Sequence, residues 1–131
     1  MKRTLSLQEL AIASHRKLGG KIGIVSKAPL RSQEDLKIYY TPGVGAVSSY
    51  LATHKKEARA LTIKGNTVAV ISDGSRVLGL GNIGPEAALP VMEGKAMIFK
   101  EFAGVDAFPI VLATQDVGEI VKTIRYISPA F

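Results

Sequence analysis

Apolar residues recur at helical spacing near the start of the chain, and strand-like runs appear further along. Ser6 and Glu9 form the sequence pattern of a helix-capping box, and Gly19 ends the amphipathic segment that follows. The apolar residues 22–25 predict a short strand. After a polar connection we expect a second short helix, which Pro42-Gly43 breaks.

The middle of the chain alternates between helix and strand patterns. Apolar positions recur at helical spacing over about residues 47–60, which predicts a third helix. The continuous apolar run at residues 68–71, bounded by Asp73-Gly74, is typical of a buried strand covered on both faces. Residues 76–78 are expected to pair as another short strand.

The last third of the chain predicts helix, strand and helix. Residues 85–102 favour a helix with Pro85 in its first turn, and residues 108–112 form the next apolar strand. Asp116 and Glu119 form a second pattern of the capping kind, before a final helix. Helices that alternate with buried strands predict an α/β fold, here a three-layer domain with a small, largely parallel sheet flanked by helices.

Composition indicates one soluble domain. The chain has 131 residues, of which 47% are hydrophobic and 21% charged, and no apolar run approaches the roughly 20 residues of a membrane-spanning helix. It has no cysteine, which is compatible with the reducing cytoplasm, the expected location. The net charge of +6 is spread without one long basic run, so we expect no nucleic acid partner and no membrane partner.

A glycine-rich segment, Gly79-Leu80-Gly81-Asn82-Ile83-Gly84, satisfies the pattern G-x-G-x-x-G. It follows a strand-like stretch and precedes a predicted helix, which is the context of a dinucleotide-binding loop. The same pattern is also typical of a tight turn that requires glycine conformations. The pattern by itself leaves both interpretations open.

Three motifs occur in one order: Gly20-Lys21-Ile22, the YTPGV segment at residues 40–44, and the long segment at residues 70–109. Together they resemble the N-terminal, amino-acid-dehydrogenase-like domain of malic enzymes of the prokaryotic type. The resemblance covers nearly all of residues 1–131. It implies that the nucleotide fold is a separate, later domain, and that the glycine-rich segment shapes the substrate side.

The resemblance implies oxidative decarboxylation of malate to pyruvate and CO2, with NAD or NADP as oxidant and Mn2+ or Mg2+ as the metal. Lys95 matches the family's general base, and Tyr40, before T-P-G-V, matches the acid that protonates enolpyruvate. Tyr39 is the rival of Tyr40 because a shift of one residue exchanges them, and we expect it to pack. A lysine serves as a base only where burial or nearby positive charge favours its neutral form.

Two further residues are candidates for substrate binding by the same resemblance. Arg76 matches an arginine that grips a substrate carboxylate with two hydrogen bonds, and a surface ion pair is the equal alternative. Asn82 is a weaker candidate for contact with substrate or cofactor. His15 and His54 are each alone in a helix, so a structural place is expected for both. Asp73 is expected to shape a turn.

The family continues past residue 131 into a segment with metal ligands and an NAD(P)-binding domain. We therefore expect no metal ligand and no tightly bound cofactor in this chain, and no malate turnover by the chain alone. A homodimer is expected, with catalytic groups shared across subunits as one possibility. The alternative function is a noncatalytic dicarboxylate-binding or subunit-interaction module, and nucleotide binding at the glycine loop is a minor third. NAD or NADP preference is not encoded here.

Overall fold

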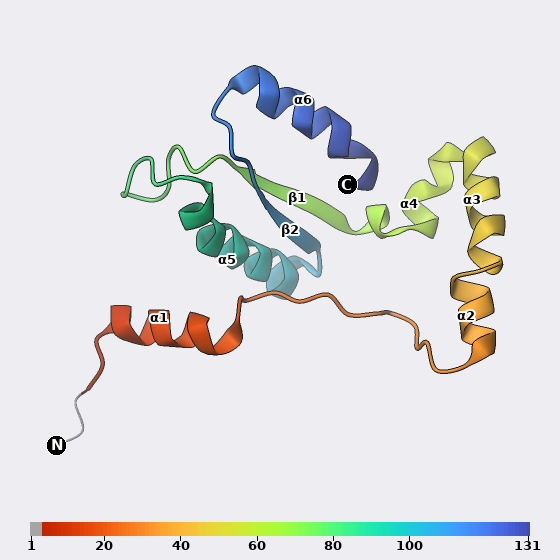
Figure 1. The fold of residues 1–131 in the computed structure, drawn as a ribbon, viewed down its shortest axis with the longest axis horizontal. Coiled ribbons are helices and arrows are strands. Elements are labelled where there is room, and N and C mark those ends of the chain that lie inside the picture. Colours follow the sequence, from red (N-terminus) through yellow and green to blue (C-terminus); the bar gives the residue numbers. More distant parts are fainter. Residues whose placement is uncertain (1–3) are drawn as a thin grey trace.

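A computed structural model describes residues 4–131 and contains two parallel strands, six α-helices and three short 3₁₀ turns within that range (Figure 1). The strands β1 (Thr67–Ser72) and β2 (Asp106–Val111) pair in register from Thr67 opposite Asp106 to Ser72 opposite Val111. The helices in chain order are α1 (Leu7–Leu18), α2 (Gln33–Tyr39), α3 (Gly43–Thr53), α4 (Ala58–Leu61), α5 (Pro85–Ala103) and α6 (Val117–Ile127).

Helix α1 follows the sequence prediction at both ends. The Ser6 hydroxyl accepts from the Glu9 amide at 3.2 Å, and the Glu9 carboxylate accepts from the Ser6 amide at 2.9 Å. Gly19 ends the helix in the left-handed conformation, with φ of 68°. Ser32 and Asp35 form an equivalent box in front of α2. The local hydrogen bonds of a capping box need only residues three apart, so sequence is enough to predict them.

Two predicted strands are wrong. Residues 22–25 form no strand, and Ile24 and Val25 are 81% and 84% exposed, because no neighbouring strand lies beside them to complete a ladder. Residues 76–78 form a turn instead, in which the Val77 amide donates to the Gly81 carbonyl at 3.0 Å. Leu78 in that turn has φ of +50°, which no β-strand contains.

The third predicted helix is divided and begins earlier than predicted. It starts at Gly43, directly after a cis Thr41–Pro42 peptide bond, and stops at Thr53. The His54 ring stacks on the Tyr50 ring with centroids 4.1 Å apart, and its Nδ1 contacts the Tyr50 carbonyl at 3.0 Å. A 3₁₀ turn at Lys55–Glu57 then separates α3 from α4.

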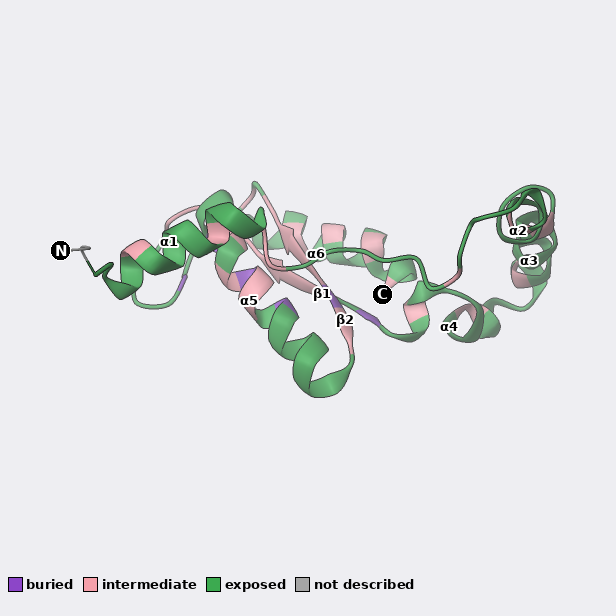
Figure 2. Ribbon diagram, turned by 90° about the horizontal axis from the view of Figure 1, so that it is seen from below, coloured by how far each residue is buried: buried purple, intermediate pink, exposed green. Residues whose placement is uncertain are grey.

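The α5 and α6 helices lie on opposite sides of the strand pair (Figures 1 and 2), which confirms a three-layer α/β arrangement with a small parallel sheet. Helix α5 packs against both strands through Ala88, Met92 and Ala96, which are four residues apart and buried. Asp116 is the N-cap residue of α6, and its carboxylate accepts from the Glu119 amide at 2.8 Å. The predicted reciprocal bond is absent here, because Glu119 accepts from Thr114 instead.

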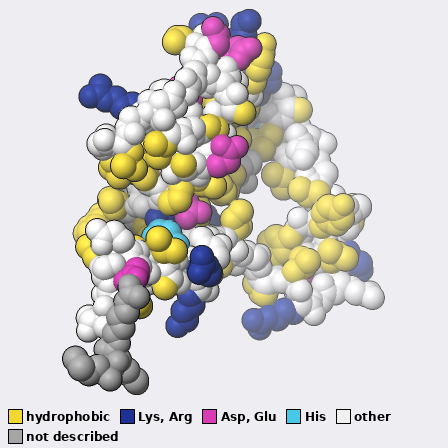
Figure 3. Space-filling model, turned by 60° about the vertical axis from the view of Figure 1, so that its left-hand side comes forward, with side chains coloured by type: hydrophobic (Ala, Val, Ile, Leu, Met, Phe, Trp, Pro, Cys, Tyr) yellow, Lys and Arg dark blue, Asp and Glu magenta, His cyan; other side chains and the backbone are white. Residues whose placement is uncertain are grey.

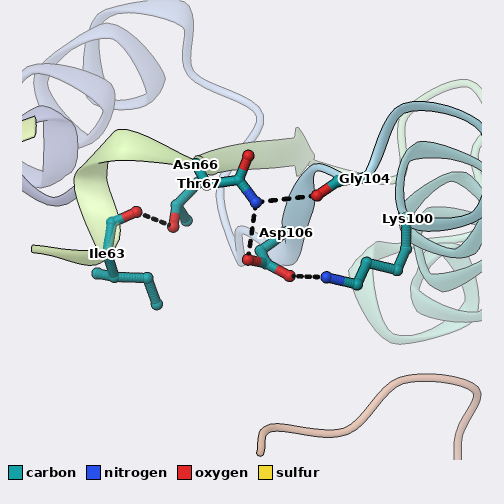
Figure 4. A network of polar contacts seen from close by, with 6 residues as sticks. All are labelled: Ile63, Asn66, Thr67, Lys100, Gly104 and Asp106. Carbon is teal, nitrogen blue, oxygen red and sulfur yellow. Dashed lines mark hydrogen bonds and ion pairs between the residues drawn. The ribbon is translucent and has the colours of Figure 1, made fainter. Parts of the chain in front are cut away.

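A polar network joins the starts of the two strands (Figure 4). The Asn66 amide donates to the Gly104 carbonyl at 2.9 Å and to the Asp106 carboxylate at 3.0 Å. Lys100 of α5 donates to the other Asp106 oxygen at 2.7 Å. These hydrogen bonds, first that from Lys100 and then that from Asn66, lower the pKa of Asp106 below its usual value.

Much apolar surface stays exposed over the elements of the chain (Figures 2 and 3). The accessible surface is 10281 Å². A compact folded monomer of this mass is expected to expose only about 6,700 Å². None of the described residues has a large side chain that is fully buried. In the described part of the chain, no helix is long and apolar enough to cross a membrane.

Candidate active site

The carboxyl ends of β1 and β2 meet at one edge of the sheet, where ligands commonly bind to parallel sheets. The loop after β1 leads into α5, and the loop after β2 leads into α6. The two loops and the first turn of α5 border a cavity of about 350 Å³ that is open to solvent. It is lined by Asp73, Pro85, Glu86, Leu112, Ala113, Thr114 and Gln115. This cavity lies at the start of α5, directly after the glycine-rich loop.

Asp73 begins the loop after β1 and forms a turn with Ser75, as predicted. Its carboxylate accepts from the Ser75 amide at 3.0 Å and from the Ser75 hydroxyl at 2.8 Å. These two hydrogen bonds lower the pKa of Asp73 below its usual value, so the cavity wall carries a negative charge at neutral pH.

Gly74 lies against the glycine-rich loop at a distance that only glycine permits. A Cβ atom built on Gly74 would be 2.0 Å from the Gly84 carbonyl oxygen, and Gly74 has φ of +72°. The Gly74 carbonyl also accepts from the Ile83 amide at 3.1 Å. Gly84, with φ of +80°, is the residue before the first turn of α5. The close approach therefore holds the loop at the start of α5.

The glycine-rich loop departs from the geometry of a dinucleotide-binding loop. In that geometry the first glycine directly follows a strand that leads into a helix. Here β1 ends at Ser72, and the turn at residues 77–81 separates it from the rest of the motif. The loop is a glycine-dependent turn at the edge of the sheet, which favours the second of the two interpretations of the motif.

Asn82 contacts Gln115 across the edge of the sheet. Each side-chain amide donates to the carbonyl oxygen of the other, at 3.1 Å in both directions. Gln115 belongs to the loop after β2, so this pair ties the two loops together. Gln115 was not among the residues predicted for the site. Its position three residues after a predicted strand places it in a loop at the carboxyl end of that strand, where site residues are common.

Lys95 and Arg76 are both exposed and do not line the cavity. Arg76 belongs to the loop after β1. Lys95 lies ten residues along α5 from Pro85, a rise of about 15 Å in an α-helix. Within this single chain, the structure does not bring Lys95 to the cavity.

Tyr40 lies outside the layered part of the molecule. It is the residue after α2, and α2 packs with α3 at the end of the molecule away from α5 (Figures 1 and 2). Tyr40 is 64% exposed and Tyr39 is 55% exposed, so Tyr39 does not pack into a core within the single chain. The structure does not bring Tyr40 and Lys95 together.

The histidines have structural partners, and no metal centre is formed by the described residues. His15 contacts Ala11 and Lys21, and His54 contacts Tyr50 and Thr53. Among residues 4–131 no group of three or more His, Cys, Asp or Glu side chains is arranged to hold a metal ion. The described residues therefore supply no complete donor set for a divalent cation.

The parallel strand pair, the glycine turn and α5 define an α/β domain with a cavity at the carboxyl ends of its strands. Its glycine-rich loop differs from that of a dinucleotide-binding fold. The family model for the N-terminal domain of malic enzymes matches residues 19–129. A solved structure of the NAD-dependent malic enzyme from Thermotoga maritima is 47% identical with a TM-score of 0.90, covering 92% of this chain and 34% of that chain. The chain therefore belongs to the malic enzyme family.

Curated relatives give the same family and a measure of length. The NAD-dependent malic enzyme of Geobacillus stearothermophilus is 60% identical over 114 residues, covering 87% of this chain and 24% of that protein. The bifunctional malic/malolactic enzyme of Bacillus subtilis is 51% identical over 127 residues, covering 97% of this chain and 31% of that protein. The chain thus spans between a quarter and a third of the length of these relatives.

Proposed function

We propose that this chain is the substrate and acid–base part of a malic enzyme. The complete enzyme would oxidise malate with NAD or NADP and release CO2 and pyruvate in the cytoplasm. The observation that carries this proposal is the match of residues 19–129 to the family's N-terminal domain, with the malic-enzyme fold at a TM-score of 0.90. Relatives of both NAD-dependent and NADP-dependent kinds support a nicotinamide cofactor without choosing between the two.

Lys95 and Tyr40 have opposite proton-transfer roles in the proposed reaction. Lys95 would take the proton from the malate hydroxyl, and the nicotinamide held by the rest of the enzyme would supply the hydride acceptor for this oxidation. Loss of CO2 from the resulting oxaloacetate leaves enolpyruvate, and Tyr40 donates a proton to its carbon to form pyruvate. Arg76 would bind a substrate carboxylate through its two parallel N–H groups, and Asn82 would orient the loop beside it.

The metal and the nucleotide would be held by the rest of the enzyme. The curated relatives named above are three to four times as long as the matched region, which leaves room for both sites. The cation would supply Lewis-acid stabilisation of the enolate. We therefore expect this chain alone to be inactive toward malate and to bind neither NAD nor NADP tightly.

We further propose that the enzyme is a homodimer in which Tyr40 of one copy meets Lys95 of the other. Within one chain α2 and α5 lie apart, and Tyr40 is too exposed to deliver a proton in a dry site (Figure 1). A partner copy would supply the missing cover and the second catalytic group. After subunit exchange between Tyr40→Phe and Lys95→Ala, half of all dimers are mixed, and each mixed dimer holds one intact site out of two. The exchanged sample would then regain roughly a quarter of wild-type activity. No recovery after subunit exchange would contradict the sharing.

The experiment that tests the function is malate-dependent reduction of NAD and NADP with Mn2+ or Mg2+. The chain alone is compared with the chain mixed with a purified C-terminal nucleotide domain. We expect activity only in the mixture, with loss in Lys95→Ala and Tyr40→Phe. Inactivity of the mixture, with both proteins folded and associated, would instead favour a noncatalytic dicarboxylate-binding or subunit-interaction module.

A further inference from the structure

The segment after α1 contacts α5 just before Lys95. The Lys21 amide donates to the Glu93 carboxylate at 3.2 Å, and the Lys21 ammonium donates to the Pro90 carbonyl at 2.5 Å. Gly20 has φ of +110°, and a Cβ atom there would be 3.3 Å from the Glu93 carboxylate. The chain therefore approaches α5 closely over one helical turn, from Pro90 to Glu93.

His15 of α1 completes this contact and its proton position follows from its partners. Its Nδ1 lies 2.8 Å from the Ala11 carbonyl, which can only accept, so Nδ1 carries the proton. Its Nε2 lies 2.9 Å from the Lys21 ammonium, which can only donate. In the tautomer with the proton on Nδ1, His15 donates to Ala11 and accepts from Lys21, which orients the Lys21 ammonium toward Pro90.

Pro90 interrupts the hydrogen-bond ladder of α5 in the turn before the one that Lys21 contacts. Proline has no amide hydrogen, so the Glu86 carbonyl loses its usual helical partner and the backbone ladder is interrupted there. In a regular helix the Pro90 carbonyl accepts from the amide of Gly94, the residue before Lys95. A Cβ atom on Gly94 would be 3.8 Å from the Lys21 ammonium. Lys21 thus gives the Pro90 carbonyl a second donor, in the turn that follows the interruption and leads to Lys95.

We propose that Lys21 is a positioning residue for Lys95, and this rests on the proposed function of Lys95 as the base. Lys21 holds the turn from Pro90 to Gly94, with His15 and Glu93 as its partners, and so sets where the Lys95 side chain leaves the helix. Lys21 touches no reacting atom in this role. Its substitution affects the rate of the chemical step more than the binding of malate.

The first test uses the chain alone and needs no activity. Amide hydrogen exchange is measured by NMR in Lys21→Met, with Lys17→Met as the control, because Lys17 is an exposed lysine of α1. We expect Gly94 and Lys95 to exchange about tenfold faster in Lys21→Met while Ala88 is unchanged, and neither to change in the control. Unchanged exchange at Gly94 and Lys95, or equal acceleration along all of α5, would overturn the positioning role.

The imidazole nitrogen shifts of His15 give a second readout on the same sample. We expect the neutral form with the proton on Nδ1 in the wild-type chain and a mixture of the two neutral forms in Lys21→Met. A wild-type His15 with its proton on Nε2 would contradict the contact with Lys21.

The second test uses the mixture with the nucleotide domain. We expect kcat to fall by about tenfold to a hundredfold in Lys21→Met, with KM for malate within about twofold, and Lys21→Arg to recover part of the loss. A rise in KM with unchanged kcat would overturn the proposal. If the wild-type mixture is itself inactive, or if Lys95→Ala retains activity, the proposed function fails, whereas the exchange test still decides whether Lys21 holds the turn.

Discussion

At the scale of single residues, Gly74 lets two backbone segments of the candidate site approach closely because it has no side chain. Its close approach to the Gly84 carbonyl joins the loop after β1 to the start of α5. The Asp73-Gly74 pair was predictable as a turn. The partner of Gly74, ten residues further along, was not, because local sequence does not report which backbone another glycine will touch.

Gly74→Ala is expected to destabilise the chain by about 3 kcal/mol or more, because left-handed strain adds to an overlap with backbone. Gly81→Ala is the matched control, since Gly81 has φ of +76° with no neighbouring atom within 4 Å of an added Cβ. It should lose only about 1 kcal/mol from the same backbone strain. Urea unfolding at one protein concentration measures both. Equal losses would show that the overlap at Gly74 is relieved by movement of the loop.

The Asn82–Gln115 pair predicts a measurable coupling between the two loops of the cavity. Asn82→Ala and Gln115→Ala should each lose about 0.5–1.5 kcal/mol of unfolding free energy, and the double variant should lose less than their sum. The reason is that both single variants remove the same two hydrogen bonds. Thermal or urea unfolding of the four proteins gives the coupling. Strict additivity would mean that the two amides do not interact in solution.

At the scale of elements, the helix ends were the most predictable part of the fold. The box at Ser6 and the end of α1 at Gly19 were predicted and are confirmed, because they depend on neighbouring residues alone. The box at Ser32 was not predicted, although it is equally local. Strands were predicted correctly where a long apolar run found a parallel partner, as in β1 and β2. Residues 22–25 have an apolar pattern of the same kind but no partner, so they remain without a ladder.

The network at Asp106 predicts how the start of the sheet responds to acid. Hydrogen bonds from Lys100 and Asn66 lower the pKa of Asp106 in the folded state below the usual value of about 3.9. A lowered folded pKa stabilises the fold above the unfolded pKa, and this stabilisation is lost as pH falls through the folded pKa. Asp106→Asn should therefore lower Tm at pH 7, and the difference from wild type should shrink below about pH 4.

The control for that experiment is Glu101→Gln, which removes an exposed carboxylate near the end of α5, beside Lys100. It should change Tm little at any pH, because exposed carboxylates contribute little to stability. A difference between Asp106→Asn and wild type that stays constant from pH 7 to about pH 2 would mean that the carboxylate charge is not what holds the strand starts.

At the scale of the whole molecule, the exposed surface exceeds that of a compact monomer by about half. The excess is apolar on several elements, including α1 and the helix pair of α2 and α3, where Leu10, Ile12, Ile38 and Val47 are all exposed. Such a surface is typical of a part that packs against further protein. The relatives are three to four times as long as the matched region, so their remaining residues are one kind of protein that could cover this surface. A second copy of the chain is another.

We therefore expect the chain alone to self-associate. Light scattering should report a mass above the 13.9 kDa of one chain at high protein concentration. Substituting lysine at both Ile38 and Val47 should reduce that mass, while lysine at both Ile24 and Val25, also exposed but in the connecting segment, serves as the control. A monomeric mass at high concentration would contradict both self-association and the proposed homodimer.

The sequence by itself determined the family, the α/β class, both ends of α1 and the strands β1 and β2, because these depend on local patterns and on motifs in a fixed order. Only the tertiary structure decided that Gln115 meets Asn82, that Lys21 holds the turn before Lys95, and that Tyr40 lies apart from Lys95. Asn82 and Gln115 are 33 positions apart in the sequence, and Lys21 and Pro90 are 69 positions apart. The partners in such contacts depend on how helices and strands pack. No local pattern specifies that packing.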